Sequence, residues 1–202
     1  MSRMLYSETY PVQKGDFVRA GEASARIKRA LRQLGVDSDK LRRASVAAYE
    51  SEINLIIHSL GGTLSLEVTP EEIIIISKDR GPGIKDISLA MKEGWSTAGD
   101  SIREMGFGAG MGLPNMKRHS DFFDISSSED GTRRICCATA AKHLVQTLKR
   151  HFAPIFVRRL SLSIAVKKQS RKETAVKGDR RESVLSFRYT GQGKMHRLHK
   201  LS

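Results

Sequence analysis

The stretch from Glu72 to Ile84 constrains the fold of this chain most. It joins an apolar run to a turn at which another backbone segment or a ligand can come close. Its first half is β-branched and predicts a buried strand. That strand delivers the carboxylate of Asp79 into a turn containing Gly81 and Gly83. Glycine adopts positive φ and lets another backbone or a ligand come close, and a carboxylate offers acceptors to an amino group. Taken alone, the pattern is also typical of an ordinary turn with an Asp cap.

A second constraint lies on a helix expected from about Ser38 to Ser59. Glu50 and Asn54 are four residues apart, so they stack on one side of it, roughly 5–6 Å apart. They lie beside its arc of large apolar residues, and the solvated side is expected near Glu52 and Ser59. A carboxylate and an amide there suit ligation of a divalent cation and positioning of a nucleophile. The alternative is a solvated Glu/Asn pair.

A third constraint is the segment Met105–Leu113, where glycines alternate with other residues from Gly106 to Gly112. Such a backbone can wrap a polyphosphate with its N–H groups, and the helix expected next, from Met111 to His119, adds its positive end. The spacing matches neither a P-loop nor a Rossmann motif. A flexible linker is the alternative, which the apolar flanks and the following helix make weaker.

The remaining elements follow from alternation and from Gly, Pro and Asp as breakers. A long polar segment that follows the first constraint and leads into the third is interpreted as a lid. In chain order we expect a strand at 4–12, a helix from Asp16 to about Leu34 with Val18 on its apolar side, a strand at 63–69 in a hairpin with the Ile-rich strand, the lid at 86–110, a strand at 121–127 and a last strand after Gly131-Thr132.

Charge is distributed unevenly along the 202 residues, whose net charge is +13. Residues 1–133 contain 18 Lys+Arg and 19 Asp+Glu, whereas residues 134–202 contain 17 and 3. The sequence after Gly131-Thr132 predicts only a faint strand, then an amphipathic helix at about 139–152, and 166–202 lacks core periodicity, as disordered tails do. We therefore predict a folded domain at 1–138 and a basic, poorly ordered extension at 139–202, with the chain from Arg134 onward outside the working part.

Two origins of this tail stay open, a shifted reading frame near codon 133 and a lineage-specific extension. Its structural alternative is an edge strand and covering helix over Ile135–Val145, and its functional alternative is a basic arm for nucleic acid or an acidic partner. Without a folded motif or stacking aromatics, nucleic-acid binding is expected only through this tail.

Several classes are disfavoured by composition. The two cysteines, Cys136 and Cys137, are adjacent and cannot form a disulfide framework or a four-ligand zinc site. The N-terminus does not resemble a signal peptide, and no apolar run approaches the roughly 20 residues of a membrane span. We expect a cytoplasmic protein that does not bind membranes.

Together the three stretches resemble a known pattern. The E-x-x-x-N pair, the D-x-G-x-G-I turn and the G-x-G-x-G-L loop are similar to the N, G1 and G2 boxes of the GHKL (Bergerat-fold) ATPase superfamily. Ala47–His58, Ala90–Ala98 and Met105–Pro114 further resemble its anti-sigma factor-type serine/threonine kinases, which act in partner-switching systems. The resemblance covers roughly Leu5 to Thr132. It implies an α+β fold, a two-layer sandwich of a mixed β-sheet with helices on one face, as in histidine-kinase-like ATPase domains.

The resemblance implies a role for each matching residue. Glu50 matches the residue that orients or activates the attacking hydroxyl or water, Asn54 matches the Mg²⁺ ligand, and Asp79 matches the carboxylate that reads adenine. Arg103 matches a γ-phosphate partner, and Thr132 a support of the adenine contact. The remaining nucleotide-binding positions are Gly81, Gly83, Ile84, Thr97, Gly108, Gly110, Met111, Gly112 and Leu113.

The function implied is transfer of the γ-phosphoryl group of ATP, with Mg²⁺, to a serine or threonine of a STAS-domain (anti-anti-sigma) protein. A sigma factor or another regulator is a further implied partner. The rival is an ATP-gated binding module that sequesters a regulator without phosphotransfer. Homodimers are common in the resembled family, so a homodimer stays open.

Overall fold

A computed structural model of the chain describes residues 4–139, 185–190 and 195–197. Its helices are α1 (Glu22–Gln33), α2 (Ser38–His58), α3 (Ile87–Ala90), α4 (Asp100–Glu104) and α5 (Gly112–Arg118). Its strands are β1 (Tyr6–Val12), β2 (Gly62–Val68), β3 (Glu72–Asp79), β4 (Phe122–Ser128), β5 (Gly131–Thr139), β6 (Leu185–Thr190) and β7 (Met195–Arg197).

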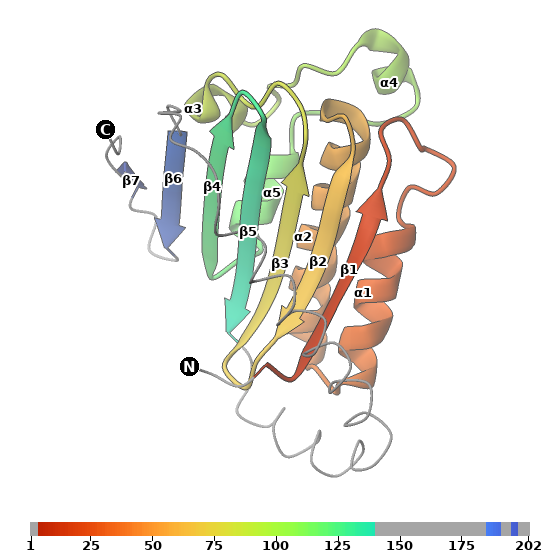
Figure 1. Cartoon of the computed structure of the whole chain (residues 1–202), viewed down its shortest axis with the longest axis vertical. Coiled ribbons are helices and arrows are strands. Elements are labelled where there is room, and N and C mark those ends of the chain that lie inside the picture. Colours follow the sequence, from red (N-terminus) through yellow and green to blue (C-terminus); the bar gives the residue numbers. More distant parts are fainter. Residues whose placement is uncertain (1–3, 140–184, 191–194, 198–202) are drawn as a thin grey trace, which may run out of the picture.

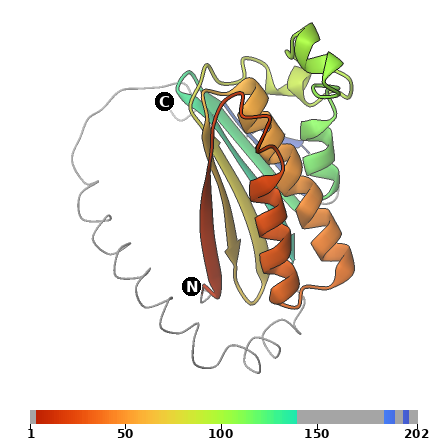
Figure 2. The same ribbon diagram turned by 90° about the vertical axis from the view of Figure 1, so that its right-hand side faces the viewer.

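The described strands form one sheet in the order β1-β2-β3-β5-β4-β6-β7 (Figure 1). Helices α1, α2 and α5 cover one face of it, as the turned view in Figure 2 shows. Helix α2 lies across β1, β2, β3 and β5, and contacts α1 on one side and α5 on the other. The two-layer α+β class with helices on one face is thereby confirmed.

One detail of that prediction is wrong, because the expected mixed sheet is antiparallel at every pairing of the described strands. Strands β3 and β4 do run in the same direction, since both pair antiparallel with β5. However, β5 turns back from β4 and inserts between the two. The parallel strands are therefore neighbours along the chain but not in the sheet.

The core forms where alternating strand residues meet the small residues of α2. Every second residue of the central strands is buried under the helices, as period-2 alternation requires. These strand residues are Leu64, Leu66, Val68, Ile73, Ile75, Phe123 and Ile125. Ala44, Ala47, Ala48 and Ser51 of α2 are also buried, and their small size lets the helix lie close to the sheet and to its neighbours.

The rotation of α2 differs from the sequence-based expectation. Glu52 and Ser59, placed on the solvated side, are only 2% and 3% exposed, whereas Tyr49 and Leu60 of the apolar arc are 43% and 57% exposed. The reason is that α2 packs against the sheet and against two helices. Its buried face is therefore wide and rich in alanine, which a search for large apolar residues does not find.

Glu52 is buried because its carboxylate caps another helix. Its Oε1 accepts the N–H of Ala23 at 3.0 Å and its Oε2 accepts the N–H of Ser24 at 2.9 Å, in the first turn of α1. Helix N-termini leave such N–H groups without intrahelical partners, and a negative charge there is favourable. Helix α1 therefore begins at Glu22, and Asp16, the expected cap, instead pairs with Arg19. Val18, expected on the apolar side of this helix, is exposed in the preceding loop.

We expect Glu52→Gln to lower the free energy of unfolding by about 1.5–3 kcal/mol, the range for hydrogen bonds to a charged group. The amide keeps one acceptor but turns a donor toward an N–H of α1. Glu22→Gln is the matched control, because Glu22 lies in the same helix turn but is exposed. Urea unfolding of both variants measures the difference, and equal losses would contradict the capping role.

The faint strand expected after Gly131-Thr132 is a nine-residue strand, β5, in the middle of the sheet. The hypothesis that the chain from Arg134 onward lies outside the working part is therefore wrong for Arg134–Thr139. Alternation was missed because the inward positions Thr132, Arg134 and Cys136 include a buried cation where an apolar residue was expected.

Only parts of the basic extension are described. Residues 185–190 form β6, which pairs with β4, and 195–197 form β7 beyond it, so strands occur where none was expected. The helix expected at about 139–152 lies outside the described residues, apart from Thr139, which ends β5. The division into a domain at 1–138 and an extension at 139–202 stays a prediction. Within the part of the chain that the structure describes, no helix has the length and apolarity to cross a membrane.

Candidate functional site

The carboxylate of Asp79 lies at the end of β3, next to the start of β5. Its Oδ1 accepts the backbone N–H of Thr132 at 2.8 Å. Gly131 has φ +149°, and a Cβ on it would overlap the backbone of Asp79. Glycine is needed at residue 131 because the strands approach too closely there for a side chain. The structure thus brings the expected residues Asp79 and Thr132 together.

A hydrogen bond and close packing hold the turn after β3 against the β4–β5 hairpin. The N–H of Ile84 donates to Ser127 Oγ at 2.7 Å, and Ser127 Oγ lies 2.8 Å from Thr132 Oγ1. A Cβ on Gly83 would overlap the carbonyl oxygen of Ser128, and Gly81 lies against Ser59 with φ +152°. Glycine is therefore required at residue 83 by a close backbone contact and is favoured at residue 81 by its positive φ.

An unexpected partner of Asp79 is Arg134, two residues beyond Thr132 on the same face of β5. Its Nη2 donates to Asp79 Oδ2 at 2.7 Å, and its Nε donates to Ser77 Oγ at 2.9 Å. Arg134 is only 3% exposed. Burial lowers the pKa of Arg134, while the nearby charge of Asp79 acts in the opposite direction. Sequence reasoning missed this residue because it assigned Arg134 to the tail.

An open pocket of about 240 Å³ lies at this end of the sheet. Asp79 and Thr132 both contribute to its lining, so the acceptor oxygens and the Gly-Thr pair border the same space. The lining residues are Lys78, Asp79, Ser126, Ser127, Ser128, Asp130, Gly131, Thr132 and Arg133.

Glu50 and Asn54 of α2 both face Gly112, the first residue of α5. A Cβ on Gly112 would lie 3.2 Å from Asn54 Oδ1 and 3.4 Å from Glu50 Oε2. Glu50 Oε1 accepts a hydrogen bond from Asn115 Nδ2 at 2.7 Å. Asn115 was missed by sequence reasoning. The only available signal was its position one helical turn after Gly112, which places both residues on one face of α5.

The glycine loop before α5 packs against the segment at 94–98. Gly110 has φ +74°, and a Cβ on it would lie 2.5 Å from the carbonyl oxygen of Trp95. Gly108 has φ +75°, and its Cβ would overlap the side chain of Ala98. Of the other loop residues assigned to nucleotide binding, Met111 is the N-cap residue of α5 and Leu113 is part of the core. Gly108 and Gly110 are therefore required by the packing of the loop against this segment.

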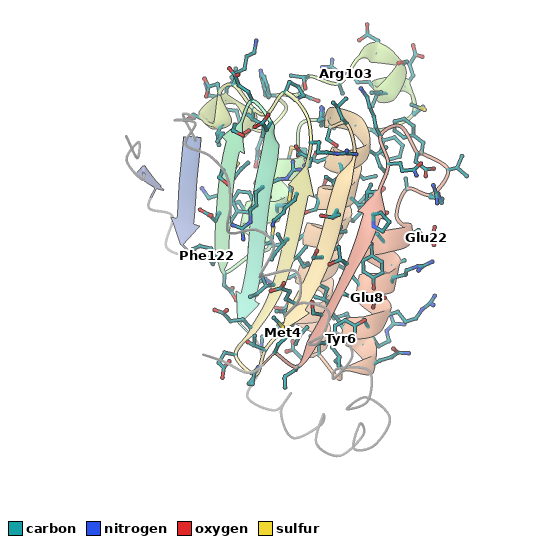
Figure 3. All side chains as sticks on the ribbon, viewed as in Figure 1. Met4, Tyr6, Glu8, Glu22, Arg103 and Phe122 are labelled. Carbon is teal, nitrogen blue, oxygen red and sulfur yellow. The ribbon has the colours of Figure 1, made fainter. Side chains whose placement is uncertain are left out.

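The expected lid at 86–110 lies at the same end of the molecule as the turn after β3 (Figure 1). Thr97 Oγ1 lies 3.1 Å from Nδ1 of His58, at the end of α2. Burial and, to a smaller extent, the charge of Arg134 lower the pKa of His58. Arg103 lies on α4 in this lid (Figure 3), is exposed, and its Nη2 donates to the carbonyl oxygen of Ser96 at 3.5 Å. Arg103 is thus held in the lid and not by the Glu50–Asn54 pair.

The residues around Gly112 fit a metal-bound polyphosphate. Nδ2 of Asn54 is buried and has no hydrogen-bond partner among the described residues. A buried donor of this kind is satisfied by an acceptor such as a phosphate oxygen, while Oδ1 of the same amide suits Mg²⁺. The missing side chain at Gly112 leaves room beside both atoms. Asn54 is therefore the residue that would hold the cation.

One comparison with known proteins gives a match. Over 100 residues the chain is 32% identical to the serine/threonine-protein kinase RsbT of Bacillus subtilis (strain 168). The aligned part is 48% of this chain and 69% of that protein. No family model matches the chain.

Proposed function

The chain belongs to the family of serine/threonine-protein kinases that includes RsbT, and on this premise we propose that it transfers the γ-phosphoryl group of ATP to a serine or threonine of a protein partner. The proposal includes the nucleotide, Mg²⁺ and the GHKL type of site. The observation that carries it is the convergence of Glu50, Asn54 and Gly112. A carboxylate, an amide whose Nδ2 has no partner in the described part of the chain, and a glycine border one space there.

Nucleotide binding is proposed to extend from the end of β3 to the start of α5. At one end Asp79 accepts from the adenine amino group, with Thr132 supporting it and the turn residues and Thr97 lining the base. At the other end the N–H groups of the glycine loop and the start of α5 hold the phosphates, and Arg103 of the lid meets the γ-phosphate. The lining residues of the turn and loop are Gly81, Gly83, Ile84, Gly108, Gly110, Met111, Gly112 and Leu113.

Glu50 is proposed to take the proton of the attacking hydroxyl. Asn115 holds Oε1, so Oε2 is the oxygen directed toward Gly112 and the phosphates. As the hydroxyl oxygen bonds to the γ-phosphorus, its proton passes to Oε2 and the bond to ADP breaks. When bound, Mg²⁺ at Asn54 neutralises phosphate charge during this step.

A protein substrate can approach Glu50 from outside the nucleotide site. Glu50 also lines an open groove of about 520 Å³ beside α1 and α2. Its other lining residues are Lys28, Ser38, Leu41, Arg42, Ser45, Val46 and Tyr49. Glu50 borders both this groove and the proposed nucleotide site. A hydroxyl of the partner and the γ-phosphate would therefore meet beside its carboxylate.

The partner proposed is a STAS-domain protein of a partner-switching system in the cytoplasm, with a sigma factor or another regulator as a further partner. The deciding experiment incubates the chain with γ-³²P-ATP, Mg²⁺ and a STAS-domain protein encoded by the same genome. Label on the serine or threonine of that protein is the expected result. Stable ATP binding and partner binding without label would favour the rival, a sequestering module.

For Asp79→Asn we expect ATP binding to weaken by at least about 1–3 kcal/mol, the cost of an unpaired buried polar group. The variant keeps the side-chain size but replaces an acceptor oxygen by a donor that faces the adenine amino group. Asp130→Asn is the matched control, because Asp130 lines the same pocket and is exposed. Calorimetry with Mg-ATP measures both, and equal affinities in the two variants would contradict the role of Asp79.

A further inference from the structure

The buried ion pair between Arg134 and Asp79 lies where the proposed function places the base of the nucleotide. We propose that Arg134 is a positioning residue for base recognition, which fixes the ionised carboxylate of Asp79 so that it presents only acceptors to the base. This inference rests on the proposed function, because it assumes that Asp79 reads the adenine amino group. It adds a specificity-determining residue from a strand that the sequence pattern left outside the site.

The guanidinium is held at two points on β3. Arg134 lies opposite Ser77 in the register of β3 and β5, and its Nε donates to Ser77 Oγ at 2.9 Å. Its Nη2 reaches Asp79, two residues further along β3, and donates to Oδ2 at 2.7 Å. Ser77 is 1% exposed, and the side chains of Arg134 and Asp79 are 4% and 7% exposed. The planar fork of arginine suits such a bridge between two acceptors.

The carboxylate of Asp79 is consequently restrained on both oxygens. Thr132 N–H occupies one acceptor site on Oδ1, and Arg134 occupies one on Oδ2. A carboxylate has about four such sites, so acceptors remain on both oxygens for an incoming donor. Rotation of the side chain would break both bonds at once. Asp79 therefore presents fixed acceptor oxygens, and no donor of its own, to the pocket that it borders with Thr132.

This arrangement predicts which bases are accepted. An adenine amino group donates to these acceptors. Hypoxanthine has a carbonyl oxygen at the same position, which is itself an acceptor and cannot hydrogen-bond to the carboxylate. A site built to pair with one polar group rejects an analogue that lacks it, because the buried site groups are left unpaired. Without the hydrogen bond from Arg134, Oδ2 of Asp79 is no longer held and the carboxylate can turn away from the base. A turned carboxylate leaves room for the hypoxanthine oxygen.

The test compares ATP with inosine triphosphate by calorimetry, using the full chain with Mg²⁺. We expect Arg134→Met to reduce the preference for ATP by at least about tenfold, mainly through weaker ATP binding. Arg32→Met is the matched control, since it makes the same substitution at an exposed arginine in the last turn of α1, which does not line the pocket bordered by Asp79. We expect it to leave the preference unchanged. Equal preferences in the two variants would overturn the proposal.

Two further variants separate this inference from the proposed function and from simple loss of fold. Asp79→Asn should abolish the preference, and if it does so while Arg134→Met does not, the inference fails and the role of Asp79 stands. If the unaltered protein binds both nucleotides equally, both fail. Arg134→Lys keeps the charge but cannot bridge Ser77 and Asp79, so its preference should fall between those of the unaltered protein and Arg134→Met.

Thermal unfolding monitors the fold of each variant. A loss of folded structure would weaken the binding of both nucleotides alike and leave the ratio of their affinities unchanged. If Arg134→Met does not fold, Arg134→Lys decides alone. A preference equal to that of Arg32→Met would then overturn the proposal, and a preference lowered by a few-fold or more would support it.

Discussion

Replacing Glu50 by glutamine is expected to lower the rate of phosphotransfer by about 10²–10⁴-fold, the usual contribution of a general base. The amide has nearly the same shape, so Asn115 can still bond to it, but it cannot take the proton of the attacking hydroxyl. Binding of Mg-ATP should change little, because Glu50 is proposed to act on the acceptor and not on the nucleotide. Single-turnover transfer of label to the proposed STAS-domain partner measures the rate.

The control for Glu50 is Glu71→Gln, the same chemical change in the turn between β2 and β3, at the opposite end of β3 from Asp79. Glu71 is exposed, so its variant should transfer phosphate at the normal rate. Normal transfer by Glu50→Gln would contradict the catalytic role. Loss of transfer together with loss of ATP binding would instead place Glu50 in the nucleotide site.

The second large effect is expected for Gly110→Ala, which should weaken ATP binding by more than about 100-fold. The added Cβ would lie 2.5–2.6 Å from backbone atoms of Gly94 and Trp95, which no rotamer change can relieve. Overpacking costs about 1–3 kcal/mol and the left-handed backbone about 1–2 kcal/mol more. The loop must therefore move away from residues 94–98, and its N–H groups move with it.

Gly106→Ala separates the clash from the backbone strain. Gly106 lies in the same loop with φ +84°, but a Cβ there meets nothing within 4 Å. Its variant carries the left-handed strain alone and should bind ATP within about tenfold of the unaltered protein. Calorimetry with Mg-ATP compares the two. Similar losses in both variants would show that the contact of Gly110 with the lid does not position the loop.

The elements of the fold were largely predictable because their signals are local. The alternation in β2, the Ile-rich run of β3 and the i, i+4 pair Glu50 and Asn54 each lie within a few residues of sequence. Glycines mark places where the backbone takes positive φ, which Gly83 and Gly110 confirm. The order of the motifs was enough to predict the two-layer class and the family of kinases.

The helix faces and the neighbours in the sheet depended on tertiary packing. Sequence reasoning placed Glu52 in solvent, because one helix read alone cannot show that α1 begins beside it. It expected a mixed sheet, because connectivity gives strand directions but not the insertion of β5 between β3 and β4.

Arg134 shows this division between sequence and tertiary structure most clearly. The chain alone determined an acidic residue at the end of a buried strand and a Gly-Thr pair some 50 residues later, each from local pattern. It could not show that the next inward residue of β5 is the counter-charge of Asp79, because 55 residues separate the two. A cation in a strand position breaks alternation, and its partner across the sheet offsets the cost of burying the charge. That partner is assigned by register, which the folded sheet sets.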